Sequence, residues 1–230
     1  MNDFRYIERN FRELTDEVGD LAAGLGRAMP TVVAVTKSAT DEELLALLSF
    51  GAVDIGENRP GEVKRRGELL RAAGYAPRMH EIGTLQRNKI KYIADSVHLI
   101  HSVDSLKLAE DISRLAARFE RNIPVLIEVN SAREENKSGI SPEECESLFL
   151  AVRELPNITV SGLMTMGPVC DDPEDIRPYF RETKQLFDSL SEKYGFSGTP
   201  TLSMGMSDSY RIAVEEGSTL IRVGRKLFKK

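Results

Sequence analysis

Hydrophobic and polar positions follow two alternating patterns along most of the chain. Short apolar runs rich in valine, isoleucine and threonine are separated by longer stretches in which apolar residues recur every three or four positions. The first pattern is typical of strands buried on both faces, and the second is typical of amphipathic helices. The predicted strands are 31–37, 53–56, 79–82, 97–101, 123–129, 158–164, 201–204 and 219–223.

The predicted helices lie before the first strand and between successive strands. Thr40 and Ser141 each begin a Ser/Thr-x-x-Glu sequence, which predicts a capping box at the start of the helix that follows. A shorter basic segment with Arg87, Lys89 and Lys91 is also predicted to begin a helix. The remaining pattern predicts helices over 2–25, 40–50, 60–73, 105–119, 141–155, 172–194 and 207–216.

Eight strands that alternate with helices indicate an α/β protein with a parallel sheet. Within 230 residues, this number of units predicts a single (β/α)8 TIM-like barrel with an extra N-terminal helix, so that residues 1–230 form one domain. An open doubly wound sheet is the alternative. It would usually have fewer strands and a glycine fingerprint, but no G-x-G-x-x-G sequence follows the first strand.

Composition and charge narrow the possible partners. The formal net charge of −5 argues against a nucleic-acid-binding surface or an anionic membrane surface. No apolar run approaches the roughly 18–20 residues that a membrane-spanning helix needs. The first ten residues are polar and do not resemble a signal peptide. The two cysteines, Cys145 and Cys170, form no CxxC pair, so we expect a reduced, cytoplasmic setting.

The first predicted strand, 31–37, ends in a lysine. Five of its seven residues are β-branched, and it is apolar on both faces, so Lys37 would sit at the end of a buried strand. A desolvated lysine holds its proton less tightly, and its free amine can form a Schiff base with a carbonyl compound. The alternative is a lysine whose aliphatic stem packs on the strand while its ammonium group reaches water.

Two sequences at the ends of the seventh and eighth predicted strands suggest an anion site. Ser-Met-Gly-Met-Ser, 203–207, combines a flexible glycine with a hydroxyl group at a helix start, and Arg-Val-Gly-Arg, 222–225, ends the last strand. Loops at these positions of a barrel commonly hold phosphate through backbone N–H groups. Alternatively, Ser207 could be only a helix N-cap and Gly224 only a turn residue.

A phosphate site opposite a Schiff-base lysine suggests a phosphorylated aldehyde, and pyridoxal 5'-phosphate (PLP) fits this description. Arg222 would then face the pyridine nitrogen. Because an arginine stays protonated, it would leave the ring nitrogen without a proton and make the cofactor a weak electron sink. This pattern favours a protein that holds PLP over one that drives chemistry with it.

Several sequences spread along the chain together resemble the YggS/PROSC family of PLP homeostasis proteins. These sequences are AVTK (34–37), GEN (56–58), H-x-IG-x-LQ-x-NK (80–89), N-x6-KSG (130–139), GLMTM (162–166), LSMGMSDS (202–209) and GSTLIRVG (217–224). The resemblance implies a single-domain barrel like the N-terminal domain of bacterial alanine racemase. It also implies a role in vitamin B6 and amino-acid balance, without established catalytic turnover.

The same resemblance implies roles for individual residues. Lys37 matches the Schiff-base lysine and Arg222 the residue that faces the pyridine nitrogen. Ser207, Gly224 and the backbone N–H of Arg225 match the phosphate site. Three further positions are implied around the ring: Met206 beside the phosphate site, Asn58 near the ring, and Met164 or Met166 against one ring face.

Three hypotheses follow. The first is a PLP carrier, a monomer by resemblance, from which apo-PLP enzymes would take the cofactor. The second is an amino-acid racemase-like enzyme of low activity. Two-base racemisation needs an acid/base group on each face of the substrate, and alanine racemases take one from a second domain that we do not expect here. The third is a Schiff-base aldolase that uses no cofactor.

The remaining candidates give weaker predictions. His98 and His101 are three residues apart on a predicted strand and would face opposite sides, and no cluster has metal-ligand spacing, so we expect no metal site. His80 belongs to a family motif but could serve only to satisfy backbone groups. Lys137, on a polar loop, is either solvated or a second contact for the cofactor.

Overall fold

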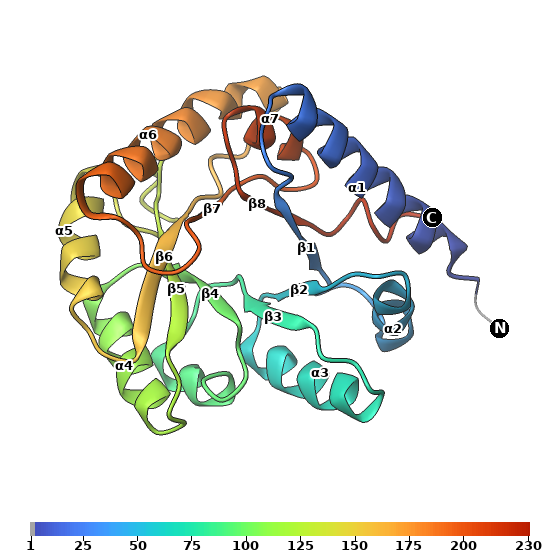
Figure 1. Ribbon diagram of the computed structural model, residues 1–230, viewed down its shortest axis with the longest axis horizontal. Coiled ribbons are helices and arrows are strands. Elements are labelled where there is room, and N and C mark those ends of the chain that lie inside the picture. Colours follow the sequence, from blue (N-terminus) through green and yellow to red (C-terminus); the bar gives the residue numbers. More distant parts are fainter. Residues whose placement is uncertain (1–2) are drawn as a thin grey trace.

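The computed structural model describes residues 3–230 and forms a closed barrel of eight parallel strands (Figure 1). Each strand pairs with the next along the chain, and β1 also pairs with β8, which closes the sheet. This arrangement confirms the predicted TIM-like barrel. The strands are β1 (Thr31–Val35), β2 (Asp54–Glu57), β3 (Arg78–Glu81), β4 (Leu99–Val103), β5 (Ile123–Glu128), β6 (Ile158–Met164), β7 (Thr201–Ser203) and β8 (Leu220–Val223).

Helices follow the strands and surround the barrel (Figure 1). A first helix precedes β1, as the sequence predicts. The α-helices are α1 (Arg5–Gly24), α2 (Asp41–Ser49), α3 (Pro60–Ala72), α4 (Leu106–Ala117), α5 (Pro142–Arg153), α6 (Arg177–Tyr194) and α7 (Tyr210–Glu215), and the two 3₁₀ helices are η1 (Arg87–Tyr92) and η2 (Pro173–Ile176).

Strand residues alternate between two apolar layers. In β5, Val125 and Ile127 join the large core between the sheet and the helices, whereas Leu126 belongs to a small second cluster. Because successive side chains of a strand point to opposite faces, this second cluster lies inside the barrel. Its members are Val33, Leu99, Leu126, Met164 and Leu220.

Several predicted element boundaries are wrong near the site. β1 ends at Val35, so Lys37 lies in the turn beyond the strand rather than at its last position. The helix predicted from Ser207 begins only at Tyr210, after a turn. The basic segment that begins at Arg87 is a 3₁₀ helix. In each case tertiary contacts, which a periodic pattern does not report, decide where the regular structure begins.

The two predicted capping boxes have different outcomes. At Thr40 the box forms: the side chain accepts from the Glu43 N–H at 3.1 Å, and the Glu43 carboxylate accepts from the Thr40 N–H at 2.8 Å. At Ser141 the hydroxyl instead donates to the carboxylate of Glu144 at 2.8 Å, so no backbone N–H is capped there.

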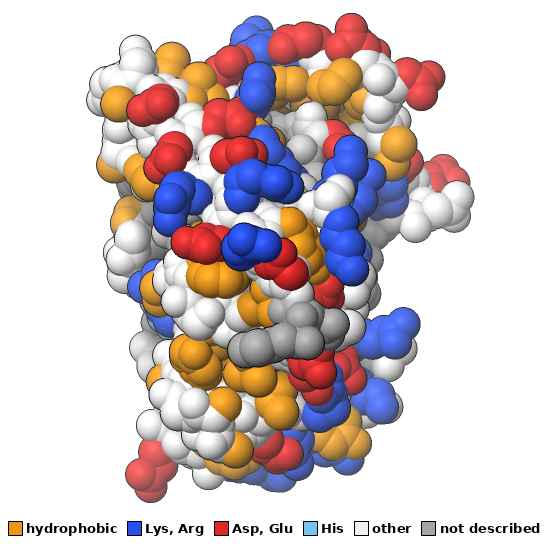
Figure 2. All heavy atoms as spheres, turned by 90° about the vertical axis from the view of Figure 1, so that its right-hand side faces the viewer, with side chains coloured by type: hydrophobic (Ala, Val, Ile, Leu, Met, Phe, Trp, Pro, Cys, Tyr) orange, Lys and Arg blue, Asp and Glu red, His pale blue; other side chains and the backbone are white. Residues whose placement is uncertain are grey.

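The helix α1 is hydrogen-bonded to residues near the C-terminus of the chain. The Asn10 side-chain amide donates to the backbone carbonyls of Leu227 at 3.2 Å and Lys229 at 2.7 Å. Figure 1 places the C-terminal end of the chain near α1, and Figure 2 shows Lys and Arg side chains next to Asp and Glu side chains on this side of the molecule. Among the helices of residues 3–230, none has the length and apolar character needed to cross a membrane.

Candidate functional site

A cavity of about 220 Å³ opens at the C-terminal end of the strands. Its lining residues lie at or just beyond the C-terminal ends of β1, β2, β3, β6, β7 and β8. This is the expected position of the active face of such a barrel. The residues that line it are Val35, Lys37, Asn58, Ile82, Met166, Met206, Ser207, Arg222, Gly224 and Arg225.

Eight of the nine residues predicted for the site therefore lie together. The exception is Met164, which is buried inside the barrel with Val33 and Leu126 and does not line the cavity. Met164 is the last residue of β6, whereas Met166 lies beyond the strand and is 41% exposed. Of the two alternatives for one ring face, Met164 or Met166, only Met166 lines the cavity, because it lies beyond the end of β6.

Two lining residues were missed by the sequence reasoning. Val35 is the last residue of β1, and Ile82 directly follows β3. Both add apolar surface to the cavity wall. Their position at the C-terminal ends of strands is the signal that could have identified them, because side chains there face the open end of the barrel.

Lys37 is exposed, which agrees with the alternative in which its ammonium group reaches water rather than with a desolvated amine. It lies in the turn that follows β1 and reaches the cavity from the rim. An exposed lysine is still available to a carbonyl compound held in the cavity. Any preference for Lys37 must therefore come from its position beside the other groups rather than from burial.

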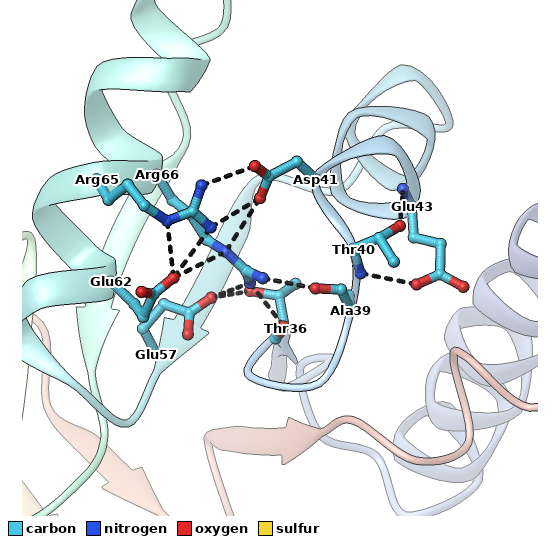
Figure 3. Close-up of polar contacts among 9 residues, drawn as sticks. All are labelled: Thr36, Ala39, Thr40, Asp41, Glu43, Glu57, Glu62, Arg65 and Arg66. Atoms are coloured by element: carbon cyan, nitrogen blue, oxygen red, sulfur yellow. Dashed lines mark hydrogen bonds and ion pairs between the residues drawn. The ribbon is translucent and has the colours of Figure 1, made fainter.

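Buried polar contacts hold the turn that carries Lys37. The Arg66 guanidinium donates to the carbonyls of Thr36 and Ala39, each at 2.6 Å, and pairs with the Glu57 carboxylate (Figure 3). The Thr36 hydroxyl also donates to Glu57. The Arg66 side chain is only 5% exposed, and that of Glu57 1%, so the pair is shielded from solvent. The segment 36–39 is thus fixed on both sides of Lys37.

The loops after β7 and β8 meet at the opposite side of the cavity. The Gly224 N–H donates to the Ser207 hydroxyl at 3.4 Å, which joins the two loops. A side chain at Gly224 would approach the Val35 carbonyl oxygen to 3.0 Å, so the glycine allows close contact with β1. The N-cap position of α7 is Ser209 and not Ser207, so the N-cap alternative for Ser207 is wrong.

Arg222 projects from β8 into the floor of the cavity. Its Nη1 donates to the Ser203 hydroxyl at 2.5 Å and its Nη2 to the Thr165 carbonyl at 3.0 Å. Burial lowers the pKa of Arg222 to about 10, an effect that nearby Glu128 opposes. The guanidinium therefore remains protonated at neutral pH, in agreement with the sequence argument.

A second cavity of about 280 Å³ adjoins the first and shares Asn58, Ile82 and Met166 with it. Lys137 lines this second cavity, where its ammonium group pairs with Glu134 at 2.6 Å. Burial, with a contribution from Asp104, raises the pKa of Glu128 to about 7. Lys137 is thus next to the site, but it does not line the cavity that holds Lys37.

The histidines also differ from expectation. His80 and His101 contact each other inside the barrel, with 2.9 Å between His80 Nδ1 and His101 Nε2. His98 is exposed, but its ring packs edge-on against that of His80, with 5.3 Å between the ring centroids. The prediction that His98 and His101 face opposite sides of a strand is therefore wrong: His98 lies just before β4, where strand alternation does not apply, and both rings contact His80. No group of three or more potential metal ligands occurs within residues 3–230.

The cavity residues fit the PLP suggested by the sequence. Lys37 supplies an amine, the Ser207–Gly224 junction supplies polar groups between two loops, and Arg222 supplies a buried guanidinium. Met166 and Met206 supply apolar surface. In addition, Asn58 Oδ1 is buried and has no hydrogen-bond partner among the described residues, so a bound molecule could satisfy it.

Comparisons with known proteins agree with this assignment. The family model described as "Alanine racemase, N-terminal domain" matches residues 3–229. A pyridoxal phosphate homeostasis protein of Aquifex aeolicus (strain VF5) is 42% identical over 208 residues, which cover 90% of this chain and 89% of that protein.

Solved structures show the same similarity. An unknown protein from Bifidobacterium adolescentis is 34% identical with a TM-score of 0.92, over 99% of this chain and 97% of that chain. PipY of Synechococcus elongatus PCC7942, solved with PLP bound, is 25% identical with a TM-score of 0.84, over 96% and 99% of the two chains. The chain therefore belongs to the alanine racemase N-terminal domain family and, within it, to the pyridoxal phosphate homeostasis proteins.

Proposed function

We propose that this protein binds PLP as a Schiff base on Lys37 and serves intracellular PLP and amino-acid homeostasis, without catalytic turnover. The observation that carries the proposal is the convergence of Lys37, Arg222 and the Ser207–Gly224 junction on one cavity. The PLP bound to PipY and the printed name of the Aquifex relative support the same ligand.

Each group has a defined task in this proposal. The amine of Lys37 would hold the cofactor through its aldehyde as a reversible Schiff base. N–H groups near Ser207, Gly224 and Arg225 hold the phosphate. Arg222 donates toward the pyridine nitrogen, while Met166, Met206 and Asn58 contact the ring. When bound, PLP supplies an electron-accepting ring, which a permanently protonated Arg222 keeps weak.

Because water can enter an exposed site, hydrolysis can free the cofactor from Lys37. The exposure of Lys37 at the cavity rim favours such a reversible bond. Apo-PLP enzymes are the proposed acceptors of the released cofactor. We expect the protein to act as a monomer in the cytoplasm.

The test begins with the absorbance spectrum of protein incubated with PLP, followed by borohydride reduction and peptide mapping. A visible band that reduction fixes onto Lys37 is expected, and Lys37→Ala should lose the label. Lys107→Ala, at an exposed lysine on α4, is the control. A label on Lys137 instead, or no label at all, would contradict the proposal.

A racemase-like enzyme of low activity is the second candidate, supported by the match to the alanine racemase N-terminal domain. It predicts formation of D-alanine or D-serine from the L-amino acid under saturating PLP. Turnover that disappears in Lys37→Ala would establish enzymatic activity and overturn the part of the proposal that excludes it. A protein that stays unlabelled would leave only the aldolase hypothesis, whose Schiff base forms directly with a carbonyl substrate.

A further inference from the structure

A continuous series of polar side chains crosses the interior of the barrel beneath the cavity. Ser203 on β7 contacts His101 on β4, with 3.0 Å between Ser203 Oγ and His101 Nδ1. His101 contacts His80 on β3 at 2.9 Å, and His80 Nε2 contacts Asp54 Oδ1 on β2 at 3.0 Å. All four are buried, each with at most 6% of its surface exposed.

The series joins the two ends of the barrel. At one end, Ser203 accepts from Arg222 at the floor of the cavity. At the other end, Asp54 and Arg78 are the first residues of β2 and β3. Arg78 donates to both Asp54 oxygens, at 2.7 and 2.5 Å, and its side chain is 49% exposed. The ion pair thus meets solvent at the face opposite the cavity.

The direction of the hydrogen bonds follows from the two ends of the series, the Arg222 guanidinium, which can only donate, and the Asp54 carboxylate, which can only accept when ionised. A guanidinium can only donate, so the Ser203 oxygen accepts and the Ser203 hydroxyl is free to donate to His101 Nδ1. His101 then carries its proton on Nε2 and donates to His80 Nδ1. His80 in turn carries its proton on Nε2 and donates to Asp54, which can only accept when ionised. The series therefore satisfies every member with one order of protons.

The charges along the series fit this order. Burial, together with the nearby His80 and Arg222, lowers the pKa of His101 well below its ordinary value, so its ring stays neutral. Burial alone would raise the pKa of Asp54, but the hydrogen bonds from His80 and Arg78 outweigh it and lower that pKa. A neutral His101 ring and an ionised Asp54 carboxylate are what the proton order requires.

We infer that Ser203, His101, His80 and Asp54 form a one-way hydrogen-bonded relay that positions Arg222 for the pyridine nitrogen of the bound cofactor. The inference rests on the proposed function for the identity of the ligand, but the order of protons does not. Without the relay, Ser203 could turn its hydroxyl toward Arg222, and the guanidinium would lose an acceptor. The relay residues act through Arg222 and do not line the cavity themselves.

The first experiment measures the protonation of the histidine rings directly. Long-range ¹⁵N–¹H correlation spectra of the full protein at neutral pH distinguish Nδ1–H, Nε2–H and charged rings. Both His80 and His101 are expected as neutral rings with the proton on Nε2. A proton on Nδ1 of either ring, or a charged His101, would overturn the relay.

The second experiment measures the effect on the cofactor. Ser203→Ala and His101→Leu should each shift the absorbance band of bound PLP and weaken PLP binding about tenfold, the effect of losing one charge-assisted contact. Ser49→Ala, at an exposed position on α2 away from the series, should leave both the band position and the affinity unchanged. If the Ser203→Ala protein matched the wild type in band position and affinity, the relay would not position Arg222.

These outcomes separate the relay from the proposed function. If the wild-type protein shows no PLP band, the proposed function fails, and with it the relay's role toward that cofactor. If the wild-type band is normal while the relay variants change nothing, only the relay fails. Should His101→Leu not fold, Ser203→Ala and the wild-type ring protonation still decide the inference.

Discussion

Arg66 is the residue on which the position of Lys37 depends most directly. Its guanidinium is the donor for the carbonyls on both sides of the turn, Thr36 and Ala39, and it neutralises Glu57. Removing one partner of a buried ion pair leaves the other without compensation and costs about 3–5 kcal/mol. We predict that Arg66→Met lowers the free energy of unfolding by about 3 kcal/mol, measured by urea denaturation.

The same substitution should also reduce the yield of borohydride-fixed PLP, because the turn that presents Lys37 loses its support. The neighbouring Arg65 provides the control. Its contacts with Asp41 and Glu62 are largely exposed (Figure 3), so Arg65→Met should cost less than about 1 kcal/mol. Equal losses of unfolding free energy and of borohydride-fixed PLP in the two variants would show that Arg66 has no special role.

Glu81 gives a prediction about pH. Burial raises the pKa of this carboxyl to about 8, and its Oε2 has no partner among the described residues. The folded protein therefore holds this proton more tightly than the unfolded chain, whose ordinary pKa is 4.5. Because this carboxyl binds more protons in the folded state between these values, its contribution to stability is fully present at low pH and is lost as pH rises toward 8.

For one such carboxyl the fall can reach about 1.4 kcal/mol per pH unit. We predict that Glu81→Gln removes this carboxyl's share of the slope between pH 5 and 8 and leaves the share of Glu128, whose pKa burial raises to about 7, as measured by urea denaturation at several pH values. Glu13→Gln, at an exposed position on α1, should keep the wild-type slope. A Glu81→Gln protein with an unchanged slope would mean that the carboxyl titrates alike in both states.

At the level of elements, the segment between β7 and α7 depends on one glycine. Gly205 has φ of +93°, and a Cβ there would come within 2.5 Å of the Ala213 Cβ. The same backbone positions Met206 and Ser207 at the cavity. We predict that Gly205→Ala lowers the free energy of unfolding by about 2–4 kcal/mol, through backbone strain and overpacking together.

Gly51 is the matched control for this variant. It has φ of +99°, but a Cβ there would meet no atom within 4 Å. Gly51→Ala should therefore show the strain alone, about 1 kcal/mol. Only Gly205→Ala should also weaken PLP binding. If the two variants lost the same stability, the contact with Ala213 would not matter.

The sequence predicted the elements of the barrel better than it predicted the local contacts of the site. Apolar runs identified all eight strands because strand burial on both faces is a local property of composition. The capping box at Thr40 is confirmed. The one at Ser141 is wrong, because the serine hydroxyl donates to the Glu144 carboxylate and does not accept from a backbone N–H. Side-chain competition of this kind leaves no periodic signal.

The site shows the same difference between what regular elements predict and what local contacts decide. Residues at or just beyond the C-terminal ends of strands, such as Arg222 and Lys37, were predicted to converge because a closed parallel barrel brings all strand ends together. The burial of Met164 and the contact between His80 and His101 depend on how side chains from different strands pack inside the barrel. The inward alternation of His80 on β3 and His101 on β4 was a usable signal, but the distance between them was not predictable from the sequence.

At the level of the whole molecule, closure of the barrel joins residues from opposite ends of the chain. Asn10 on α1 donates to carbonyls near the C-terminus, and the Lys226 ammonium group pairs with Glu17 at 2.9 Å. Leu227 is fully buried in the core that surrounds the barrel. The last residues are therefore part of the packed structure, although the sequence reasoning assigned no function to them.

This connection predicts that the ends and the centre of the barrel unfold together. Leu227→Ala should lower the free energy of unfolding by about 2–4 kcal/mol, the usual range for a buried leucine. Circular dichroism and tyrosine fluorescence should report one shared urea transition, moved to lower concentration. Leu150→Ala, at a partly exposed leucine on α5, should change stability by less than about 0.5 kcal/mol. An early, separate loss of structure in Leu227→Ala would instead show that α1 and the C-terminal residues detach while the barrel stays closed, and that β1–β8 pairing alone maintains the site.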